Sequence, residues 1–363
     1  MKIAVVVPGG VDRSGEVRVV PALLALLKRL AACHEVHVFA LRQEAEPGGW
    51  WLCGARVHNI GGRFAVPRAV HAIVLEQGRG RFDLVQSIWS GGCGVVAVAA
   101  AKWLGLPCAV HVAGGELVAL HDIGYGGRLG WRGRLREAWV LRGADVVTAA
   151  SWPVLDQLAA LGHAGQRLPL GVDLDAWPRR EPRRREVGDV LRLIQVASLN
   201  RVKDQACLLR ALAQLPTAEL DFIGEDTLHG EVQALAARLG VASRVRFHGF
   251  LTQTELQPLL ACAHLHVITS RHEAGPLALL EAAVLGVPSV GTAVGHLAEW
   301  APQAALVVKP GDADGLAALI ARIEGDETLR LQLASEAQRR ALAEDADFSH
   351  GQFERLHAEL AGR

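Results

Sequence analysis

Short apolar runs alternate with longer amphipathic segments along almost the entire chain. The apolar runs have the length of buried strands, and the segments between them have the 3.6-residue apolar spacing of helices that cover a sheet. This β-α-β-α order predicts parallel sheets with helices on both faces. In the first half the expected strands are Ile3–Val7, Val36–Ala40, Leu84–Ser87, Cys108–Val112 and Val146–Ala149, and the expected helices include Arg18–Ala32 and Val95–Leu104.

A segment rich in proline and arginine, residues 176–189, interrupts this alternation. The same order resumes after it, so the sequence predicts two doubly wound α/β domains, 1–175 and 190–345, joined by an exposed linker. The 363-residue length agrees, because one hydrophobic core seldom serves so long a chain. The second half is expected to contain strands Leu191–Ala197, Glu219–Ile223, Val245–Phe247, Leu265–Thr269 and Ser289–Gly291, with helices Gln205–Gln214, Gly230–Leu239 and Pro276–Leu285.

The place of the site follows from this fold class. Open parallel sheets bind ligands beyond the carboxyl ends of their strands, and two such domains would face each other across a cleft. Functional residues are therefore expected just after strands.

Composition narrows the compartment and the partners. With 38 basic and 38 acidic residues the net charge is zero, so nothing global indicates a nucleic-acid partner. The six cysteines include no C-x-x-C pair and are expected to be buried, reduced thiols rather than disulfides or zinc ligands. The opening MKIAVVVPGG predicts a strand and turn rather than a signal peptide, and no apolar stretch reaches the roughly 18–20 residues of a membrane span. A cytoplasmic protein is expected.

The segment Ser270–Gly295, SRHEAGPLALLEAAVLGVPSVGTAVG, carries the strongest functional signal. It leaves a strand and enters a helix near Pro276, a residue that is favoured at the first helical position. Gly275 would let the backbone approach a ligand closely. The free N–H groups at Leu277, together with the positive end of the helix dipole, would suit a phosphate group.

Two glutamates flank this helix start. Glu273 lies before it and Glu281 lies on its second turn. A carboxylate accepts hydrogen bonds from two hydroxyls at once, so the pair could hold the two ends of a sugar nucleotide. The alternative is structural: an acidic residue that favours the helix dipole, and a solvated helix glutamate.

The spacing of Glu273 and Glu281, followed by Gly286, Pro288 and Gly295, resembles the donor-site signature of family-4 retaining glycosyltransferases of the two-Rossmann-domain (GT-B) type. The likeness extends over nearly the whole chain. Further resembling segments are PGGVDRSGEVRVVPALL near the N-terminus, Leu168–Trp177, Val196–Leu212, Arg244–Leu256 and the final DFSHGQFERLHAEL. In that family the final helix, here about 346–363, packs back on the N-terminal domain, which is the acceptor domain, while the C-terminal domain holds the nucleotide sugar.

The resemblance implies roles for individual residues. Glu281 would bind the donor ribose and Glu273 would face the transferred sugar. Lys203 and the backbone of Gly275–Leu277 would hold the diphosphate. The remaining donor-site positions by resemblance are Gly15, at the start of the first helix, and Phe250, in the loop beside the donor base.

Two positions depart from the family pattern. Ser198 stands where the family usually has an arginine at the diphosphate, and Arg201 could supply the missing charge. Many relatives have a histidine near the donor sugar at the position of Ala113; here His111 is the nearby candidate for a catalytic role, or it is only a strand residue.

The implied activity is transfer of a sugar from a nucleotide-diphosphate donor, with UDP favoured, to a sugar, lipid-linked or small-molecule acceptor, with retention of configuration. No metal ion or other cofactor is expected, because no D-x-D lies in a suitable loop and Lys203, Arg201 and the helix start could neutralise the leaving diphosphate. A catalytically inactive nucleotide-sugar-binding homologue and a sugar-nucleotide 2-epimerase remain alternatives. A nicotinamide-dependent oxidoreductase is disfavoured, since no G-x-G-x-x-G follows the first strand.

A stretch of arginines and tryptophans occupies residues 126–143. The favoured interpretation is a solvated basic helix face with its tryptophans in the core. The alternative is a surface for anionic lipid, which would make the protein peripheral at the membrane, or for an anionic acceptor.

Overall fold

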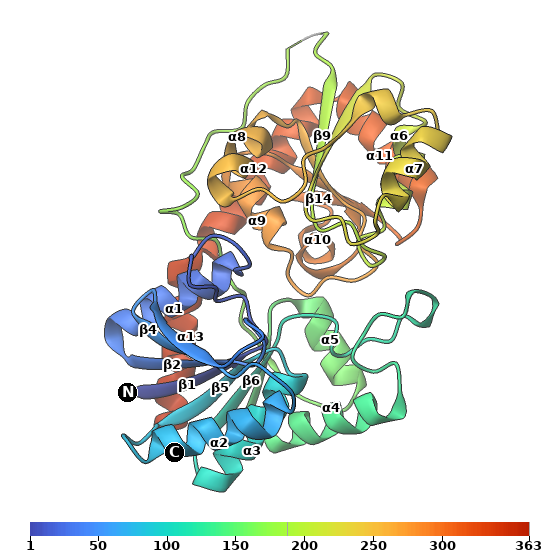
Figure 1. Cartoon of the computed structure of the whole chain (residues 1–363). Helices are drawn as coiled ribbons and strands as arrows, with labels where there is room; N and C mark the ends of the chain where they lie inside the picture. The colour runs from blue at the N-terminus through green and yellow to red at the C-terminus, as the bar shows by residue number, and fades with distance from the viewer. Residues whose placement is uncertain (187, 363) are drawn as a thin grey trace. The chain divides into compact units, whose positions relative to one another are not determined.

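The computed structural model describes residues 1–186 and 188–362, which form two compact units (Figure 1). Unit 1 contains Met1–Asp173 and the C-terminal segment from Glu344, and unit 2 contains Leu174–Ala343. The expected boundary at residue 175 lies close to this division. Residues 187 and 363, which the sequence analysis placed in the linker and in the final helix, lie outside the described residues.

Unit 1 is built on an eight-stranded sheet in the order β3-β4-β2-β1-β5-β6-β7-β8. Its central strands pair in parallel, as expected, because helices connect them. The chain moves outward from β1 in one direction and then returns to build on the other side of it. The strands are β1 (Lys2–Val7), β2 (Glu35–Ala40), β3 (Gly48–Leu52), β4 (Ala55–Asn59), β5 (Leu84–Ile88), β6 (Cys108–Val112), β7 (Val146–Ala149) and β8 (Gln166–Arg167).

One edge of this sheet differs from the expected all-parallel arrangement. Strand β3 runs antiparallel to β4, and a two-residue turn at Cys53 and Gly54 connects them. Both turn residues have positive φ, 50° and 82°, as a tight hairpin turn of this type requires. Cysteine is an uncommon residue in that conformation, so the sequence held no clear turn signal.

The two faces of the first sheet are covered by different helices. Ile3 and Val5 of β1 pack in one core with α1 and α13, whereas Ala4 and Val6 pack in another with α2, α3 and α4 (Figure 1). The helices of unit 1 are α1 (Pro21–Cys33), α2 (Ala65–Gln77), α3 (Gly92–Leu104), α4 (Trp131–Gly143), α5 (Trp152–Ala160) and α13 (Ala346–Ala361), with a short 3-10 helix at His121–Ile123.

Helix α13 belongs to unit 1 although unit 2 separates it from the rest of that unit in sequence. Phe353, Leu356 and Leu360 complete the core beneath α1. Ser349 Oγ accepts a hydrogen bond from the N–H of Gly171 at 2.8 Å, which ties the helix to the end of the first segment.

Unit 2 contains a six-stranded sheet whose strands all pair in parallel, in the order β11-β10-β9-β12-β13-β14. The order reverses between β9 and β12. The strands are β9 (Leu191–Val196), β10 (Ala218–Ile223), β11 (Val245–Phe247), β12 (Leu265–Ile268), β13 (Ser289–Thr292) and β14 (Ala305–Val308). The helices are α6 (Gln205–Leu212), α7 (Glu231–Arg238), α8 (Gln253–Cys262), α9 (Leu277–Val284), α10 (Gly295–Trp300), α11 (Ala313–Gly325) and α12 (Glu327–Ala343), with a 3-10 helix at Ala242–Arg244.

The segment expected to be an exposed linker is exposed at most of its described positions, but several of its residues are fixed to the rest of unit 2. Trp177 is fully buried, and the N–H of Arg180 donates to the carbonyl of Val284 at 3.1 Å. The N–H of Arg185 donates to the Glu327 carboxylate at 2.8 Å. Apart from Trp177, hydrogen bonds of backbone groups and of the Arg185 side chain hold this segment, and a composition poor in apolar residues does not indicate such contacts.

The cysteines are free thiols, but their burial is only partly as expected. Cys93, Cys108 and Cys207 are buried, whereas Cys33 and Cys262 are exposed. Among the described residues, no helix combines the length and the apolar character that crossing a membrane requires.

Candidate functional site

A cavity of about 80 Å³ opens in unit 2 where the strand order reverses. It lies at the carboxyl ends of β9 and β12, which is the position where open α/β sheets bind ligands. We call it the switch-point pocket. It is lined by Gln195, Val196, Ala197, Lys203, Val267, Ile268, Ser270, Glu273, Pro276, Leu277 and Ala278.

An ion pair stands at the polar side of this pocket. Lys203 Nζ lies 2.5 Å from Glu273 Oε1, and Ser270 Oγ donates to the same oxygen at 2.5 Å. The side chains of Lys203 and Glu273 are 25% and 13% exposed, so the pair is largely shielded but open to the pocket. The structure thus brings together two of the residues that the sequence analysis selected.

Hydrogen bonds fix the two loops that carry this pair. Thr269 Oγ1 donates to the carbonyl of Lys203 at 2.9 Å and accepts from Gln195 Nε2 at 2.9 Å. The N–H of Arg271 donates to the carbonyl of Val202 at 2.7 Å. The loop after β9 and the loop after β12 therefore form one hydrogen-bonded framework, which positions both charges.

A glycine lets a third loop approach this framework. Gly224 follows β10 with φ of 145°, and a Cβ there would lie 2.2 Å from the carbonyl oxygen of Ala197. Only glycine fits so close an approach in that backbone conformation. The end of β10 therefore packs directly against the loop that leads to Ser198 and Lys203.

Helix α9 begins one residue later than the sequence analysis expected. Pro276 is the N-cap residue, with an extended ψ of 113°, and Leu277 is the first helical residue. Proline has no N–H to place at this end, while the N–H groups of Leu277 and Ala278 have no acceptor within the helix. Gly275 precedes Pro276, and the start of α9 borders the switch-point pocket.

Glu281 lies on the second turn of α9 and is only 7% exposed. Burial raises the pKa of its carboxyl from 4.5 to about 7. Within the described part of the chain, no hydrogen bond or ion pair to this carboxylate occurs. A nearly buried carboxylate without a partner is costly in a folded protein, and a ligand that donates hydrogen bonds would offset that cost.

Arg201 and Ser198 lie on the same loop as Lys203 but make other contacts. Arg201 pairs with Glu231 of α7 at 3.5 Å, and both side chains are 62% exposed. The carbonyl of Ser198 accepts a hydrogen bond from Gln205 Nε2 at 3.2 Å. In this structure Arg201 therefore does not join the ion pair in the pocket.

Phe250 follows β11 in the loop before α8, and its side chain is 53% exposed. The neighbouring Gly249 accepts a hydrogen bond from the N–H of Gly224 at 2.8 Å. This bond links the Phe250 loop to the loop after β10. An exposed aromatic ring there is available for stacking on a flat ligand.

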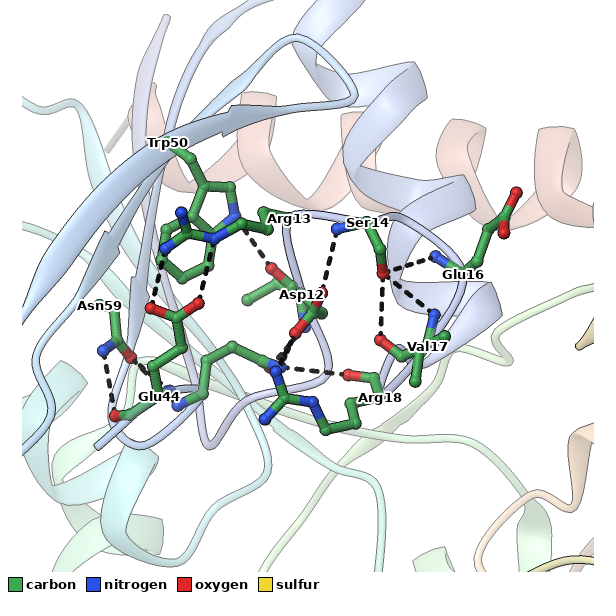
Figure 2. Close-up of polar contacts among 11 residues, drawn as sticks. Asp12, Arg13, Ser14, Glu16, Val17, Arg18, Glu44, Trp50 and Asn59 are labelled. Atoms are coloured by element: carbon green, nitrogen blue, oxygen red, sulfur yellow. Dashed lines mark hydrogen bonds and ion pairs between the residues drawn. The ribbon is translucent and has the colours of Figure 1, made fainter. Parts of the chain in front are cut away.

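In unit 1 the loop between β1 and α1 follows the strand at which the order of the first sheet reverses. Figure 2 shows the polar contacts of this loop. Gly15 lies within this loop, with φ of 72°, and not at the start of the first helix as expected, since α1 begins only at Pro21. Its N–H donates to the carbonyl of Asp12 at 3.0 Å. A Cβ at Gly15 would meet only Leu52, at 3.8 Å, so the backbone conformation rather than crowding favours glycine.

Asp12 anchors this loop. Its carboxylate accepts from the N–H of Ser14 at 3.0 Å and from Arg18 at 2.5 Å (Figure 2). The N–H of Ser14 has the largest influence and holds the pKa of Asp12 below its usual value, with the help of Arg18 and against the effect of burial. Arg13 meanwhile forms a bidentate pair with Glu44 at 3.1 and 2.9 Å. The loop is therefore held by its own charged residues.

Two family models match the chain. The model described as "Glycosyl transferase 4-like domain" matches residues 18–171, and "Glycosyl transferases group 1" matches residues 180–340. Together the two matches cover most of the chain. The chain belongs to the group 1 glycosyltransferases. The boundary between the matches falls close to the division between units 1 and 2.

Curated relatives of this glycosyltransferase include an MMP alpha-(1->4)-mannosyltransferase of Mycolicibacterium hassiacum. It is 28% identical over 75% of this chain and 69% of that protein. Matches to two further curated relatives span only 37% and 53% of their lengths.

Solved structures show the same GT-B fold. Sucrose-phosphate synthase from Thermosynechococcus elongatus has a TM-score of 0.85 at 20% identity, over 99% of this chain and 98% of that one. Anabaena HepE, solved in complex with UDP-glucose, has a TM-score of 0.76 at 21% identity, over 99% of this chain and 100% of that one. These likenesses establish the two parallel-sheet α/β domains.

His111, a candidate catalytic residue, lies in the core of unit 1 of the glycosyltransferase. Its ring is completely buried in β6, and its Nδ1 shares a hydrogen bond with Thr148 Oγ1 at 2.9 Å. The centre of the ring lies 6.0 Å from that of Phe353. Burial lowers the pKa of His111 to about 4, so the ring is neutral. Because the ring does not reach solvent, His111 cannot contact a substrate in this structure.

The structure adds a group that the sequence analysis missed. Glu116 and Glu137 are buried in unit 1, and both contact Ser90: the N–H of Ser90 donates to Glu116 at 3.0 Å and its Oγ donates to Glu137 at 2.5 Å. Burial raises the pKa of Glu137 to about 7. The carboxylates are 21 residues apart in sequence and lie in different elements, so no local motif could reveal them.

One group of side chains in the described structure could converge on a cation. His37, His58 and Glu76 lie in β2, β4 and α2 of unit 1, with His37 Nδ1 2.9 Å from His58 Nε2. The ammonium of Lys2 already lies 3.3 Å from Glu76 and 3.1 Å from Glu35. Its positive charge opposes the binding of a metal ion at that position.

Proposed function

We propose that this glycosyltransferase takes its sugar from a nucleoside-diphosphate sugar, with uridine as the favoured base, and transfers it with retention to a sugar, lipid-linked or small-molecule acceptor. The HepE structures in complex with UDP and with UDP-glucose support a uridine nucleotide in a protein of this fold. The mannosyltransferase relative is consistent with transfer of a hexose.

The unpaired, buried carboxylate of Glu281 is the observation that carries the donor assignment. The two hydroxyls of a ribose can both donate hydrogen bonds to one such carboxylate. A hydrogen-bonding ligand would stabilise the ionised form of Glu281 and lower its pKa from about 7. Nucleotide binding should therefore release protons near neutral pH.

The leaving diphosphate needs positive charge that is already in place. Lys203 lines the switch-point pocket, and the free N–H groups at the start of α9 border the same pocket. Fixed donors of this kind stabilise charge that develops in a transition state, without a metal ion. Arg201 is proposed as a secondary contributor, because reaching the diphosphate would require it to leave Glu231.

Glu273 is proposed to face the transferred sugar. In this structure its carboxylate and the ammonium of Lys203 neutralise each other. A diphosphate that binds the ammonium of Lys203 would weaken the ion pair, and Glu273 would then be free to accept hydrogen bonds from sugar hydroxyls. Donor binding and positioning of the sugar would then be coupled through this pair.

Nucleotide specificity can be tested by thermal shift with UDP, GDP, ADP and CMP. A ligand at 100 times its dissociation constant stabilises the folded protein by about 2.7 kcal/mol, so the preferred base should stand out. We expect the largest shift with UDP and a much smaller one in Glu281→Gln. A larger shift with GDP would replace the uridine assignment, and equal shifts for wild type and variant would remove Glu281 from the site.

Activity separates the proposal from its two alternatives. A transferase releases the nucleoside diphosphate and joins the sugar to an acceptor or to water. A sugar-nucleotide 2-epimerase would change the configuration at carbon 2 instead, and an inactive homologue would bind the donor without product. NMR of the transferred sugar gives its anomeric configuration, and an inverted product would overturn the proposed retention.

A further inference from the structure

Helix α4 exposes large apolar side chains to solvent. Trp131, Leu135 and Trp139 are 61%, 63% and 43% exposed. They are four residues apart, so they form one stripe along the helix. The sequence analysis favoured tryptophans in the core, and the structure contradicts that interpretation. The reason is that another face of α4 already serves the core.

The buried face of α4 consists of Glu137, Val140 and Leu141. Val140 packs so tightly on α3 that a Cβ at Gly94 would lie 2.6 Å from its Cγ1. Helix α4 therefore cannot turn its tryptophan stripe inward without breaking this contact. The helix has two apolar faces, one packed on α3 and one exposed.

Arginines border the exposed stripe. Arg132 and Arg136 lie on one side of it and Arg134 on the other, by their helical positions, and all three are exposed. Within the described part of the chain, none of these three forms an ion pair. The single acidic residue of α4, Glu137, is buried on the opposite face. The exposed surface of α4 thus combines an apolar stripe with flanking side chains whose charges are all positive.

Two cations lie directly on the tryptophan rings. The guanidinium of Arg132 lies 5.2 Å from the ring centre of Trp131, and Lys102 Nζ of α3 lies 5.5 Å from that of Trp139. These contacts hold charge beside each ring. The combination of amphipathic aromatic rings and adjacent cations suits the headgroup region of a bilayer, where one part of a side chain is apolar and the other is hydrated.

We propose that α4 docks the glycosyltransferase on the surface of a bilayer that contains anionic lipids. The tryptophan stripe would enter the interface, and the flanking arginines would lie at the anionic headgroups. Charge complementarity selects this occupant: an apolar stripe alone would suit a protein partner, and arginines alone would suit a soluble anion. A bilayer with anionic lipid satisfies both parts of the surface at once.

Vesicle sedimentation tests this proposal without any sugar donor, so its outcome is independent of the proposed function. Wild-type protein is mixed with phosphatidylcholine vesicles that contain phosphatidylglycerol, or with pure phosphatidylcholine. We expect sedimentation with the anionic vesicles at low salt and its loss at high salt. Arg132→Glu/Arg136→Glu should weaken binding by at least about thirtyfold, since two attractive charges become repulsive. Trp131→Ala/Trp139→Ala should weaken binding to the anionic vesicles at low salt, although it leaves every charge in place.

Two control variants make the same types of substitution at exposed sites outside α4. Trp51→Ala removes a tryptophan that is 69% exposed on β3, an edge strand of the unit 1 sheet. Arg183→Glu/Arg184→Glu reverses two exposed arginines of unit 2. Both controls should sediment like wild type, and circular dichroism should show intact folds.

Several outcomes would overturn the proposal. These are a wild-type protein that stays in the supernatant, α4 variants that bind like wild type, and controls that lose binding equally. The wild-type protein could instead gain thermal stability with soluble phosphate or an anionic sugar and fail to sediment with vesicles. That result would assign α4 to a soluble anion and would also overturn the proposed bilayer docking.

Discussion

Lys203 and Glu273 lie 70 residues apart in sequence, yet their charged groups meet at 2.5 Å between two loops of unit 2. Both loops follow central parallel strands, and Thr269 ties one to the other. In the absence of donor this pair keeps a cation and an anion at the switch-point pocket with little net charge. In the proposed function a diphosphate would change that balance, because it would compete with Glu273 for Lys203.

Replacement of Lys203 by alanine should lower kcat/KM by about 10²–10³-fold, because it would remove the fixed positive charge that we propose for the leaving diphosphate. Steady-state kinetics with UDP-sugar measures the effect, and the affinity for UDP should fall as well. Lys309→Ala, at an exposed lysine of the same unit, should retain wild-type rates. Equal activity of Lys203→Ala and wild type would contradict the role proposed for this lysine.

Glu281→Gln should weaken nucleotide binding and yet stabilise the unliganded protein above neutral pH. As pH rises from 4.5 to about 7, the unfolded glutamate loses its proton while the folded one keeps it, so wild-type stability falls over this window. Glutamine releases no proton, so the stability of the variant relative to wild type should rise by roughly 3 kcal/mol between pH 4 and pH 8.

Denaturant unfolding at both pH values measures this difference. Glu137, whose pKa is also raised to about 7, is present in both proteins, and its contribution cancels. Glu359→Gln provides the same chemical change at an exposed site and is the control variant for the substitution itself. A constant difference between Glu281→Gln and wild type from pH 4 to pH 8 would show that Glu281 is not held protonated.

Arg201→Ala should reduce kcat/KM by about fivefold or less. The side chain is exposed and pairs with Glu231, so in this structure it does not reach the Lys203–Glu273 pair at the switch-point pocket. Arg201→Lys serves as the charge-preserving control in the same kinetic assay. A loss as large as that of Lys203→Ala would instead show that Arg201 replaces the arginine absent at Ser198.

Turnover should persist in excess chelator, because Lys203 and the start of α9 are proposed to supply the charge that a divalent ion supplies in other enzymes. The control is the same buffer at equal ionic strength without chelator. Complete loss of activity that Mg²⁺ restores would refute the metal-independent mechanism.

The sequence predicted the parallel framework well because buried strands have a strong local signature. The predicted bounds of β6, β7 and β11 agree with the structure, and those of β1 and β2 differ by one residue. The hairpin of β3 and β4 escaped prediction, since its turn depends on positive φ at Cys53, which no residue type there indicates. Strand β14, four residues long, was also missed.

The candidate site was predictable as a set of positions but not as contacts. The motif around Glu273 and Glu281 located the β12–α9 loop, and Lys203 was found through resemblance alone. That Lys203 pairs with Glu273 depends on which strands are neighbours in the sheet, which is a long-range property. The burial of His111 and the exposure of Trp131 likewise depend on how helices cover the sheet, and local periodicity does not report this.

The place of α13 in the first core has a consequence for biosynthesis. Phe353 and Leu360 emerge from the ribosome after every residue of unit 2 has been made. Unit 2 can therefore mature while unit 1 is still missing the helix that shields α1. Although most of unit 1 is synthesised first, it should become resistant to proteolysis after unit 2. A nascent chain stalled before Ala346 should leave unit 1 exposed to proteases.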